Sequence, residues 1–203
     1  MKKDPLMKIA LFGGTFDPPT LTHEAIIAAC LAMSDFDQIW IMPSGVREDK
    51  PGMSSDASRL ELLACIGQQV FGDNSRLVIT DFEMQLPRPT ETITTVQVLQ
   101  ATYPQHDFWF VFGADSYRAM PTWRGGKQLQ ATLPMLVVER HGDSCPPASA
   151  VVRHVPLPQE VLDMCASSTK VRQAVGAGQA IDGLVSKAVL DCIFRLGLYH
   201  TVQ

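Results

Sequence analysis

The 203-residue sequence has little of what a secreted or membrane-bound protein needs. Its five cysteines are scattered, odd in number and without a C-x-x-C pair, so we expect neither a disulfide framework nor a zinc site. No apolar stretch approaches the roughly 20 residues of a membrane span. The apolar run behind the basic start MKK is too short for a signal peptide. These absences predict a protein of the reducing cytoplasm that is bound to no membrane.

An excess of positive charge is also missing. The 17 Lys and Arg residues face 21 Asp and Glu residues, which gives a formal net charge of −4. A general electrostatic surface for nucleic acid is therefore not expected, and an anionic ligand would need a local cluster of basic groups. The chain has no internal repeat and no low-complexity tract. Its length and its 46% apolar content suit one sizeable core, and we expect a single domain over residues 1–203.

What the sequence does have is a regular alternation of two patterns. Brief apolar runs, typical of parallel strands covered on both faces, occupy residues 9–12, 39–42, 77–80, 108–112 and 135–138. Segments of helical periodicity occupy residues 21–33, 57–70, 92–103, 168–177 and 184–196. Loops are expected at 44–55 and 141–148, where Gly, Pro, Ser and charged residues concentrate. The alternation predicts an α/β fold with a doubly wound parallel sheet.

The first strand ends in an unusual stretch, GGTFDPPTLTHEA, at residues 13–25. In such a sheet, ligands bind outside the carboxyl ends of the strands, and this stretch joins one of those ends to a helix N-terminus. Gly13 and Gly14 allow a close backbone approach, and free N–H groups at the helix start suit phosphate. Thr20 and His23 share a face of the first helical turn. Because neither a P-loop nor a G-x-G-x-x-G pattern is present, a plain strand–helix turn with a packing histidine is equally compatible.

A second stretch, CASSTKVRQAV at residues 165–175, has similar properties. Ser167, Ser168 and Thr169 would cap a helix and place hydroxyls and N–H groups at its positive end. Arg172 lies four residues after Ser168, on the same face, and its guanidinium suits two-pronged contact with a phosphate. Taken alone, the stretch is also compatible with an ordinary capped helix that carries a solvated arginine.

Together, GGTFDPPTLTH and SSTKVR resemble the paired motifs of the nucleotidylyltransferase superfamily, and the similarity is greatest to the nicotinate-nucleotide adenylyltransferases. Further segments of that family's pattern follow in the same order: MPSGVREDKP, RLELL, RPTETITT, FVFGADSYRAMPTW, LVVER and LGLY. The resemblance implies a Rossmann-like nucleotidylyltransferase fold. It also implies a transferase that joins the AMP part of ATP to nicotinate mononucleotide and releases pyrophosphate, in NAD biosynthesis.

The resemblance also implies roles for particular residues. Catalytic roles fall to His23, Thr20 and Arg172. The ATP-binding residues would be Gly13, Gly14, Thr15, Phe16, Gly113, Asp115, Arg140, Ser167, Ser168 and Thr169. The mononucleotide-binding residues would be Thr92, Trp123 and Lys50. The nucleophile is a phosphate oxygen that is already an anion, so positioning and charge neutralisation suffice. Mg²⁺ would arrive on ATP, without a dedicated protein site.

Some residues depart from the family pattern and leave alternatives open. Thr20 replaces a common histidine, Thr22 replaces the usual glycine, and Glu91 replaces an aromatic residue. We expect the Thr22 side chain to push the nucleotide outward. Asp115 could instead be a helix N-cap, Trp123 a core residue and Lys50 a solvated lysine. The acceptor could be nicotinamide mononucleotide or pantetheine phosphate, or the protein could bind nucleotides without catalysis. Its partners are expected to be small molecules, and both a monomer and a homo-oligomer stay open.

Overall fold

A computed structural model describes residues 5–45, 52–87, 89–139, 144–164 and 166–200. Its centre is a parallel six-stranded sheet with the order β3-β2-β1-β4-β5-β6. The strands are β1 (Lys8–Gly14), β2 (Gln38–Pro43), β3 (Leu77–Ile79), β4 (Asp107–Gly113), β5 (Met135–Val138) and β6 (Val152–Val155). The order reverses between β1 and β4, which makes the sheet doubly wound and confirms the predicted fold class.

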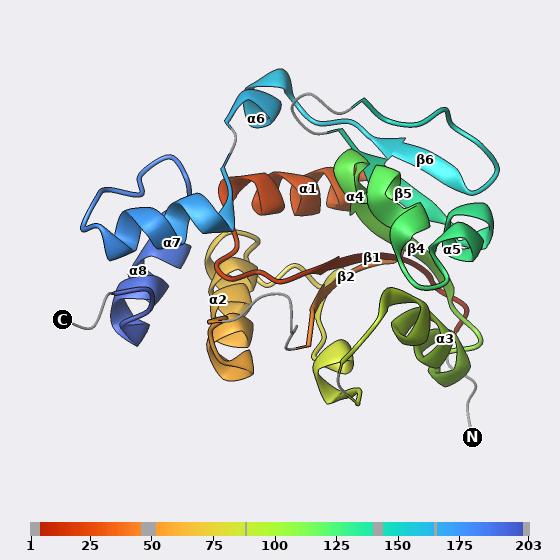
Figure 1. Cartoon of the computed structure of the whole chain (residues 1–203), viewed down its shortest axis with the longest axis horizontal. Helices are drawn as coiled ribbons and strands as arrows, with labels where there is room; N and C mark the ends of the chain where they lie inside the picture. Colours follow the sequence, from red (N-terminus) through yellow and green to blue (C-terminus); the bar gives the residue numbers. More distant parts are fainter. Residues whose placement is uncertain (1–4, 46–51, 88, 140–143, 165, 201–203) are drawn as a thin grey trace.

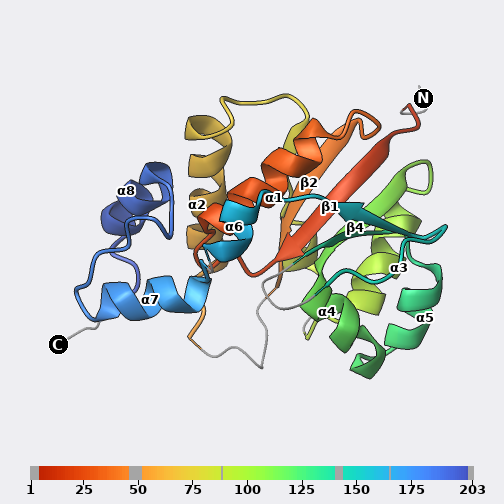
Figure 2. The ribbon, with the colours of Figure 1, turned by 90° about the horizontal axis from the view of Figure 1, so that it is seen from above.

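Helices cover both faces of this sheet (Figures 1 and 2). They are α1 (Leu21–Ala32), α2 (Asp56–Gln69), α3 (Thr92–Thr102), α4 (Ala114–Ala119), α5 (Gly126–Thr132), α6 (Gln159–Asp163), α7 (Ser168–Gly176) and α8 (Lys187–Leu196). Two 3₁₀ turns are η1 (Phe82–Gln85) and η2 (Met120–Thr122).

The alternation of side chains along β1 divides the core into two layers. Ala10 and Phe12 belong to a cluster with residues of α1, α2 and α8. Ile9 and Leu11 belong to a second cluster with residues of α3 and α5. Both sets are buried, which is why β1 reads as a continuous apolar run. The strand is thereby held rigidly from both sides up to the glycines at its carboxyl end.

Four predicted helices and the five predicted strands agree with the structure within two residues at each end. The prediction for residues 184–196 was wrong at its start, because α8 begins at Lys187 and Ser186 is its N-cap. The strand β6 was not predicted, since Arg153 and His154 interrupt its apolar pattern at the edge of the sheet. The short helices α5 and α6 were also missed, and α4 was foreseen only in the alternative reading of Asp115 as a helix N-cap. The predicted loops at 44–55 and 141–148 lie partly outside the described residues.

The C-terminal helices α7 and α8 lie together at one end of the molecule, beside α1 and α2 (Figures 1 and 2). α8 packs against α2, and the first residue of α7 contacts the turn that follows β1. This arrangement brings the two stretches singled out in the sequence to one edge of the sheet. None of the described helices has both the length and the apolar character needed to cross a membrane.

Candidate active site

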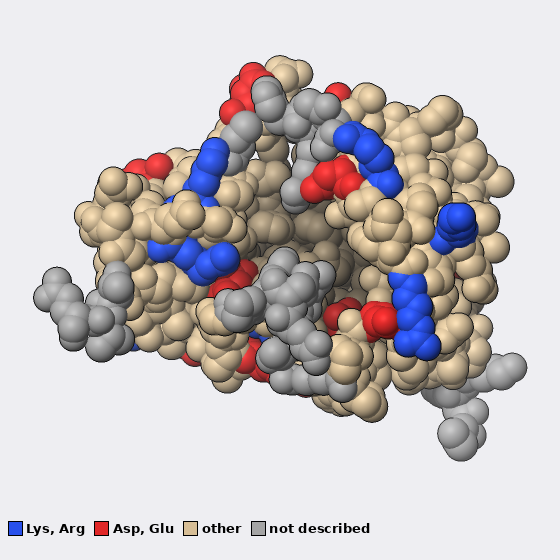
Figure 3. Space-filling model, in the orientation of Figure 1, with Lys and Arg blue, Asp and Glu red and all other residues tan. Residues whose placement is uncertain are grey.

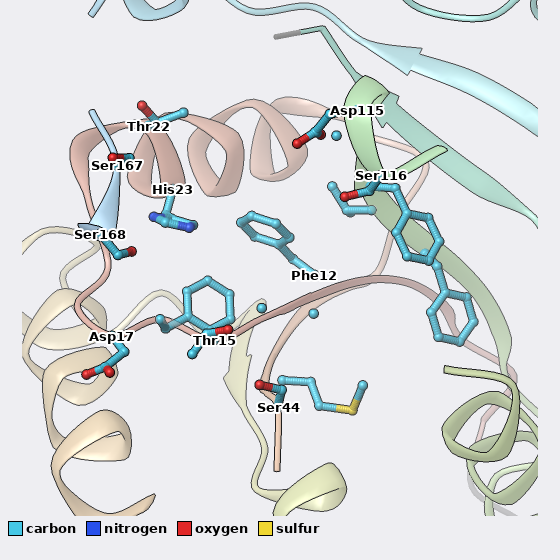
Figure 4. A pocket seen from close by; sticks show the side chains of 18 of the residues that line it. Phe12, Thr15, Asp17, Thr22, His23, Ser44, Asp115, Ser116, Ser167 and Ser168 are labelled. Carbon is cyan, nitrogen blue, oxygen red and sulfur yellow. The ribbon is translucent and has the colours of Figure 1, made fainter. Parts of the chain in front are cut away.

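A cavity of about 930 Å³ opens at the carboxyl edge of the sheet, where β1 and β4 diverge. It is visible as the central hollow in Figure 3. Residues of both sequence motifs line it, together with the start of α4. In Figure 4, His23 and Ser168 lie on one side of this cavity, and Asp115 and Ser116 lie on the other. The position is the one expected for a ligand in a doubly wound sheet.

His23 is held at the cavity wall by the residue that precedes α1. The backbone N–H of Thr20 donates to His23 Nδ1 over 3.0 Å, and the Thr20 hydroxyl lies 2.8 Å from the same nitrogen. Because a backbone N–H can only donate, Nδ1 must accept, and the ring proton of the neutral imidazole is then on Nε2. The ring also packs against Phe12 and Phe16, with centroid distances of 6.0 and 5.2 Å. The imidazole is therefore fixed in both position and tautomer.

Thr20 occupies a different place from the one its predicted role requires. Its predicted catalytic role would require the Thr20 hydroxyl to face the cavity. The side chain is instead 0% exposed and is absent from the residues that line the cavity. Its hydroxyl contacts the Nδ1 atom of the histidine ring. In this geometry Thr20 orients His23.

The two glycines at the end of β1 make room for an aromatic side chain and for the cavity. Phe16 adopts a positive φ of 50° and folds back over the strand end, where it is buried. A Cβ on Gly14 would come within 3.0 Å of the Phe16 ring, so a larger residue would displace the ring. A Cβ on Gly13 would meet nothing within 4 Å, and Gly13 borders the cavity. Thr15 also lines the cavity. All four residues predicted at the ATP site in this turn therefore border the cavity.

The second motif is joined directly to the first. Ser167 caps α7, as predicted, and accepts a hydrogen bond from the Lys170 N–H. The Ser168 hydroxyl donates to the carbonyl of Pro18 over 2.8 Å. Arg172 Nη1 donates to the carbonyl of Asp17 over 2.7 Å. Residues about 150 positions apart are thus brought into contact by the fold.

Arg172 and Thr169 complete this wall of the cavity. Arg172 Nη2 approaches the Thr169 hydroxyl at 3.4 Å, and both residues line the cavity with Ser167 and Ser168. Among the described residues that line the cavity, Arg172 alone carries a positive charge. Among the described residues, the expected local cluster of basic groups is therefore reduced to one guanidinium. The N-termini of α1 and α7 add partial positive charge beside it.

Asp17 is a site residue that the sequence reasoning missed. Its side chain is 1% exposed, and its carboxylate accepts hydrogen bonds from the Tyr199 hydroxyl at 2.7 Å and the Ser54 N–H at 3.1 Å. Burial, and then the neighbouring carboxylate, raise the pKa of Tyr199, so its hydroxyl stays protonated and donates. Asp17 therefore connects the turn after β1 to the turn that follows α8. The resemblance of LGLY to the family's ending was the one signal that pointed to Tyr199.

The opposite wall comes from β4 and the residues that follow it. Gly113 is the N-cap of α4, so the alternative reading of Asp115 as that cap was wrong. Asp115 instead lies in the first turn of α4 and lines the cavity. Trp123 lines the cavity as well, and its ring meets Phe112 edge to face at a centroid distance of 6.1 Å. Thr92, the first residue of α3, also borders the cavity.

Thr22 makes a contact that the sequence did not indicate. It lines the cavity, and its hydroxyl donates to the carbonyl of Ala166, just before α7, over 3.4 Å. The distance is long for a hydrogen bond between two oxygens, so the contact is weak. The two remaining predicted site residues, Lys50 and Arg140, lie outside the described residues.

Comparison with known proteins places the chain in a family. Residues 11–174 match the model of the cytidylyltransferase-like family. A relative from Exiguobacterium sibiricum, named "Probable nicotinate-nucleotide adenylyltransferase", is 33% identical over 96% of this chain and 100% of its own length. A relative of the same name from Shouchella clausii is 30% identical over 96% of this chain and 97% of its own length.

A solved structure agrees with the sequence relatives. Nicotinic acid mononucleotide adenylyltransferase of Plasmodium falciparum, complexed with NaAD, superposes with a TM-score of 0.78 at 20% identity, covering 95% of this chain and 97% of that one. The fold is thus that of a nucleotidylyltransferase. The chain belongs to the cytidylyltransferase-like family and, within it, to the nicotinate-nucleotide adenylyltransferases.

Proposed function

We propose that the protein transfers the AMP part of ATP to nicotinate mononucleotide and releases pyrophosphate, a step of NAD biosynthesis. One structural observation supports this proposal independently of the relatives' names. The N-termini of α1 and α7, with His23 and Arg172, converge on one cavity. Two helix N-termini, a histidine donor and a guanidinium suit a polyphosphate.

The chemistry requires little covalent participation by the protein. A phosphate oxygen of the mononucleotide attacks the α-phosphorus of ATP, the new P–O bond forms, and the bond to the β,γ-pyrophosphate breaks. The attacking oxygen is already an anion at neutral pH, so no proton has to be removed. The protein must align the two substrates and stabilise the charge that spreads over the transferred and leaving phosphates.

His23 and Arg172 fit this requirement as catalytic residues. The Nδ1 of His23 accepts from Thr20, which leaves the Nε2–H as the donor for a phosphate oxygen. Thr20 acts through His23 as a positioning residue. Arg172 lies on the other motif and would contact the phosphates of ATP, with Ser167, Ser168 and Thr169 at the same helix start.

The remaining predicted roles are assigned by the wall of the cavity on which each residue lies. Residues 13–16 would face the nucleotide, and Gly113 and Asp115 would hold the adenosine. On the acceptor side, Thr92 and Trp123 would meet the nicotinate ring, Trp123 by stacking. Lys50 and Arg140, outside the described residues, are proposed on the acceptor and ATP sides respectively.

Mg²⁺ is proposed to enter as part of the substrate, bound to ATP. The described residues contain no group of three or more His, Cys, Asp or Glu side chains that could hold a metal ion. The described His, Cys, Asp and Glu side chains therefore do not fit a metal site built by the protein alone. We propose that the chain works in the cytoplasm as one catalytic domain.

A panel of acceptors tests the proposal. The protein is incubated with Mg-ATP and, separately, nicotinate mononucleotide, nicotinamide mononucleotide and pantetheine phosphate, and pyrophosphate release is measured for each. We expect the fastest release with nicotinate mononucleotide. Faster release with another acceptor would reassign the substrate, and binding of ATP without release by any acceptor would support a non-catalytic protein.

A further inference from the structure

Arg59 is a charged side chain that the proposed mechanism does not use. It lies in α2, and its relative exposure is 0%, which makes it the largest fully buried side chain described. A guanidinium stays charged at any pH a protein meets, and burying it is costly unless its donors find acceptors. The groups that accept hydrogen bonds from Arg59 therefore indicate what the buried charge contributes to the structure.

Two acceptors are present, and one of them belongs to the proposed site. Arg59 Nη2 forms an ion pair with Asp56 Oδ1 at 2.7 Å, one turn earlier in the same helix. Arg59 Nη1 donates to the carbonyl of Thr15 at 3.0 Å. The buried Nε–H has no acceptor among the described residues. An ion pair within one helix could form equally well at the surface, so Asp56 does not explain the burial.

The Thr15 carbonyl is one of four carbonyls in this turn that accept hydrogen bonds from neighbouring parts of the protein. The carbonyl of Gly14 accepts from the Ser44 N–H, and those of Asp17 and Pro18 accept from α7. Arg59 donates to the Thr15 carbonyl from α2, which lies below this turn in Figure 1. The turn is thus anchored by its oxygens from three directions.

This anchoring has a consequence for the next peptide N–H. The Thr15–Phe16 bond is trans, so its N–H points away from its carbonyl and hence away from Arg59. Thr15 and Phe16 line the cavity, whereas Arg59 does not. The positive φ of Phe16 places this peptide in a conformation that an L-residue seldom adopts unaided.

We propose that Arg59 is a positioning residue: it fixes the Thr15–Phe16 peptide from beneath, so that the Phe16 N–H faces the triphosphate of ATP. This inference rests on the proposed function for the identity of the anion. The charge on the donor strengthens the hydrogen bond to the carbonyl and pre-orients the amide before substrate arrives. Arg59 itself touches no substrate.

Three variants separate positioning from stability. Arg59→Met removes the donors and the charge, and Arg59→Lys keeps the charge on a point donor. Asp56→Asn is the matched control, because it breaks the ion pair at the same place and leaves the bond to Thr15. Each variant is assayed with Mg-ATP and nicotinate mononucleotide at a temperature well below its own melting midpoint. The response of the Phe16 amide to Mg-ATP is followed by ¹⁵N NMR.

We expect Arg59→Met to lower kcat/KM for ATP by about 10-fold or more, with a smaller effect for the mononucleotide. Its Phe16 amide should shift less on addition of Mg-ATP than in the unaltered protein. Asp56→Asn should keep both properties even if its melting midpoint falls. If Arg59→Met does not fold, Arg59→Lys tests the proposal in its place. We expect its loss of kcat/KM for ATP to be smaller than the loss expected for Arg59→Met.

An unchanged kcat/KM in a folded Arg59 variant, or an equal loss in Asp56→Asn, would overturn the proposal. Failure of the unaltered protein to transfer the adenylyl group would instead overturn the proposed function. The Phe16 amide response to Mg-ATP would then still decide whether Arg59 positions the turn.

Discussion

The N–H of Thr20 donates to Nδ1 of His23 over 3.0 Å, so the residue before α1 determines which nitrogen of the histidine carries the proton. The Thr20 hydroxyl, 2.8 Å from the same nitrogen, holds the ring from the same side. A donor fixed before substrate binds can stabilise developing charge without reorganisation. The pair therefore gives the cavity a preoriented N–H at the start of α1.

His23→Ala should reduce kcat by about 10² or more, because it removes a preoriented donor to the phosphates. The change also leaves the Thr20 N–H without its acceptor, so stability should fall by about 1 kcal/mol, as for the loss of a cap. Steady-state kinetics and thermal melting measure the two effects. Near-normal turnover would remove His23 from the mechanism.

Thr20 offers a finer test of the same relationship. Thr20→Val removes the hydroxyl and retains the shape and the backbone N–H, so turnover should fall by less than in His23→Ala. Thr20→Ser keeps the hydroxyl and is the matched control, with turnover close to normal. If Thr20→Val lost as much activity as His23→Ala, the threonine hydroxyl itself would have to act on substrate.

Arg172→Lys should raise KM for ATP more than KM for nicotinate mononucleotide. A lysine ammonium cannot reproduce a guanidinium fork, which donates to the Asp17 carbonyl and would contact a phosphate at the same time. Lys170→Met removes a cation from the exposed side of the same helix and serves as the control. Equal changes in the two Michaelis constants, or equal effects of the two variants, would contradict a phosphate-specific role.

Thr22→Gly should increase kcat/KM for ATP and cost about 0.5–1 kcal/mol of stability through helix propensity. The reason is steric: the side chain occupies cavity space, and its 3.4 Å bond to Ala166 is too long to compensate. Thr22→Val keeps the volume without the hydroxyl and should behave like the unaltered protein. A marked loss in Thr22→Val would show that the hydroxyl contact is functional.

Glu24 predicts a pH dependence of stability. Burial raises its pKa, against the opposing effect of a 2.6 Å hydrogen bond from the Ser186 hydroxyl. A carboxyl whose folded pKa is raised favours folding below its unfolded value near 4.5, and this contribution is lost as pH rises. Glu24→Gln should therefore stabilise the protein more at pH 8 than at pH 4. Melting curves at both pH values measure this, and an equal shift at both would contradict it.

The sequence predicted the sheet because its strands are short, apolar and covered on both faces. It predicted that Ser167 caps a helix because that effect is local. It could not place Asp17 or Arg59, since their partners lie elsewhere in the chain: Tyr199 is 182 positions from Asp17, and Thr15 is 44 positions from Arg59. The buried orientation of Thr20 was missed for a related reason, because a cap and a cavity donor share the same sequence pattern.

The central claim is tested most directly by following the α-phosphate of ATP. The protein is mixed with α-labelled Mg-ATP and nicotinate mononucleotide, and the products are separated by chromatography. We predict that the label appears in nicotinate adenine dinucleotide, with one pyrophosphate released for each dinucleotide formed. Label that stays in ATP, or that appears only as free AMP, would contradict adenylyl transfer to the mononucleotide.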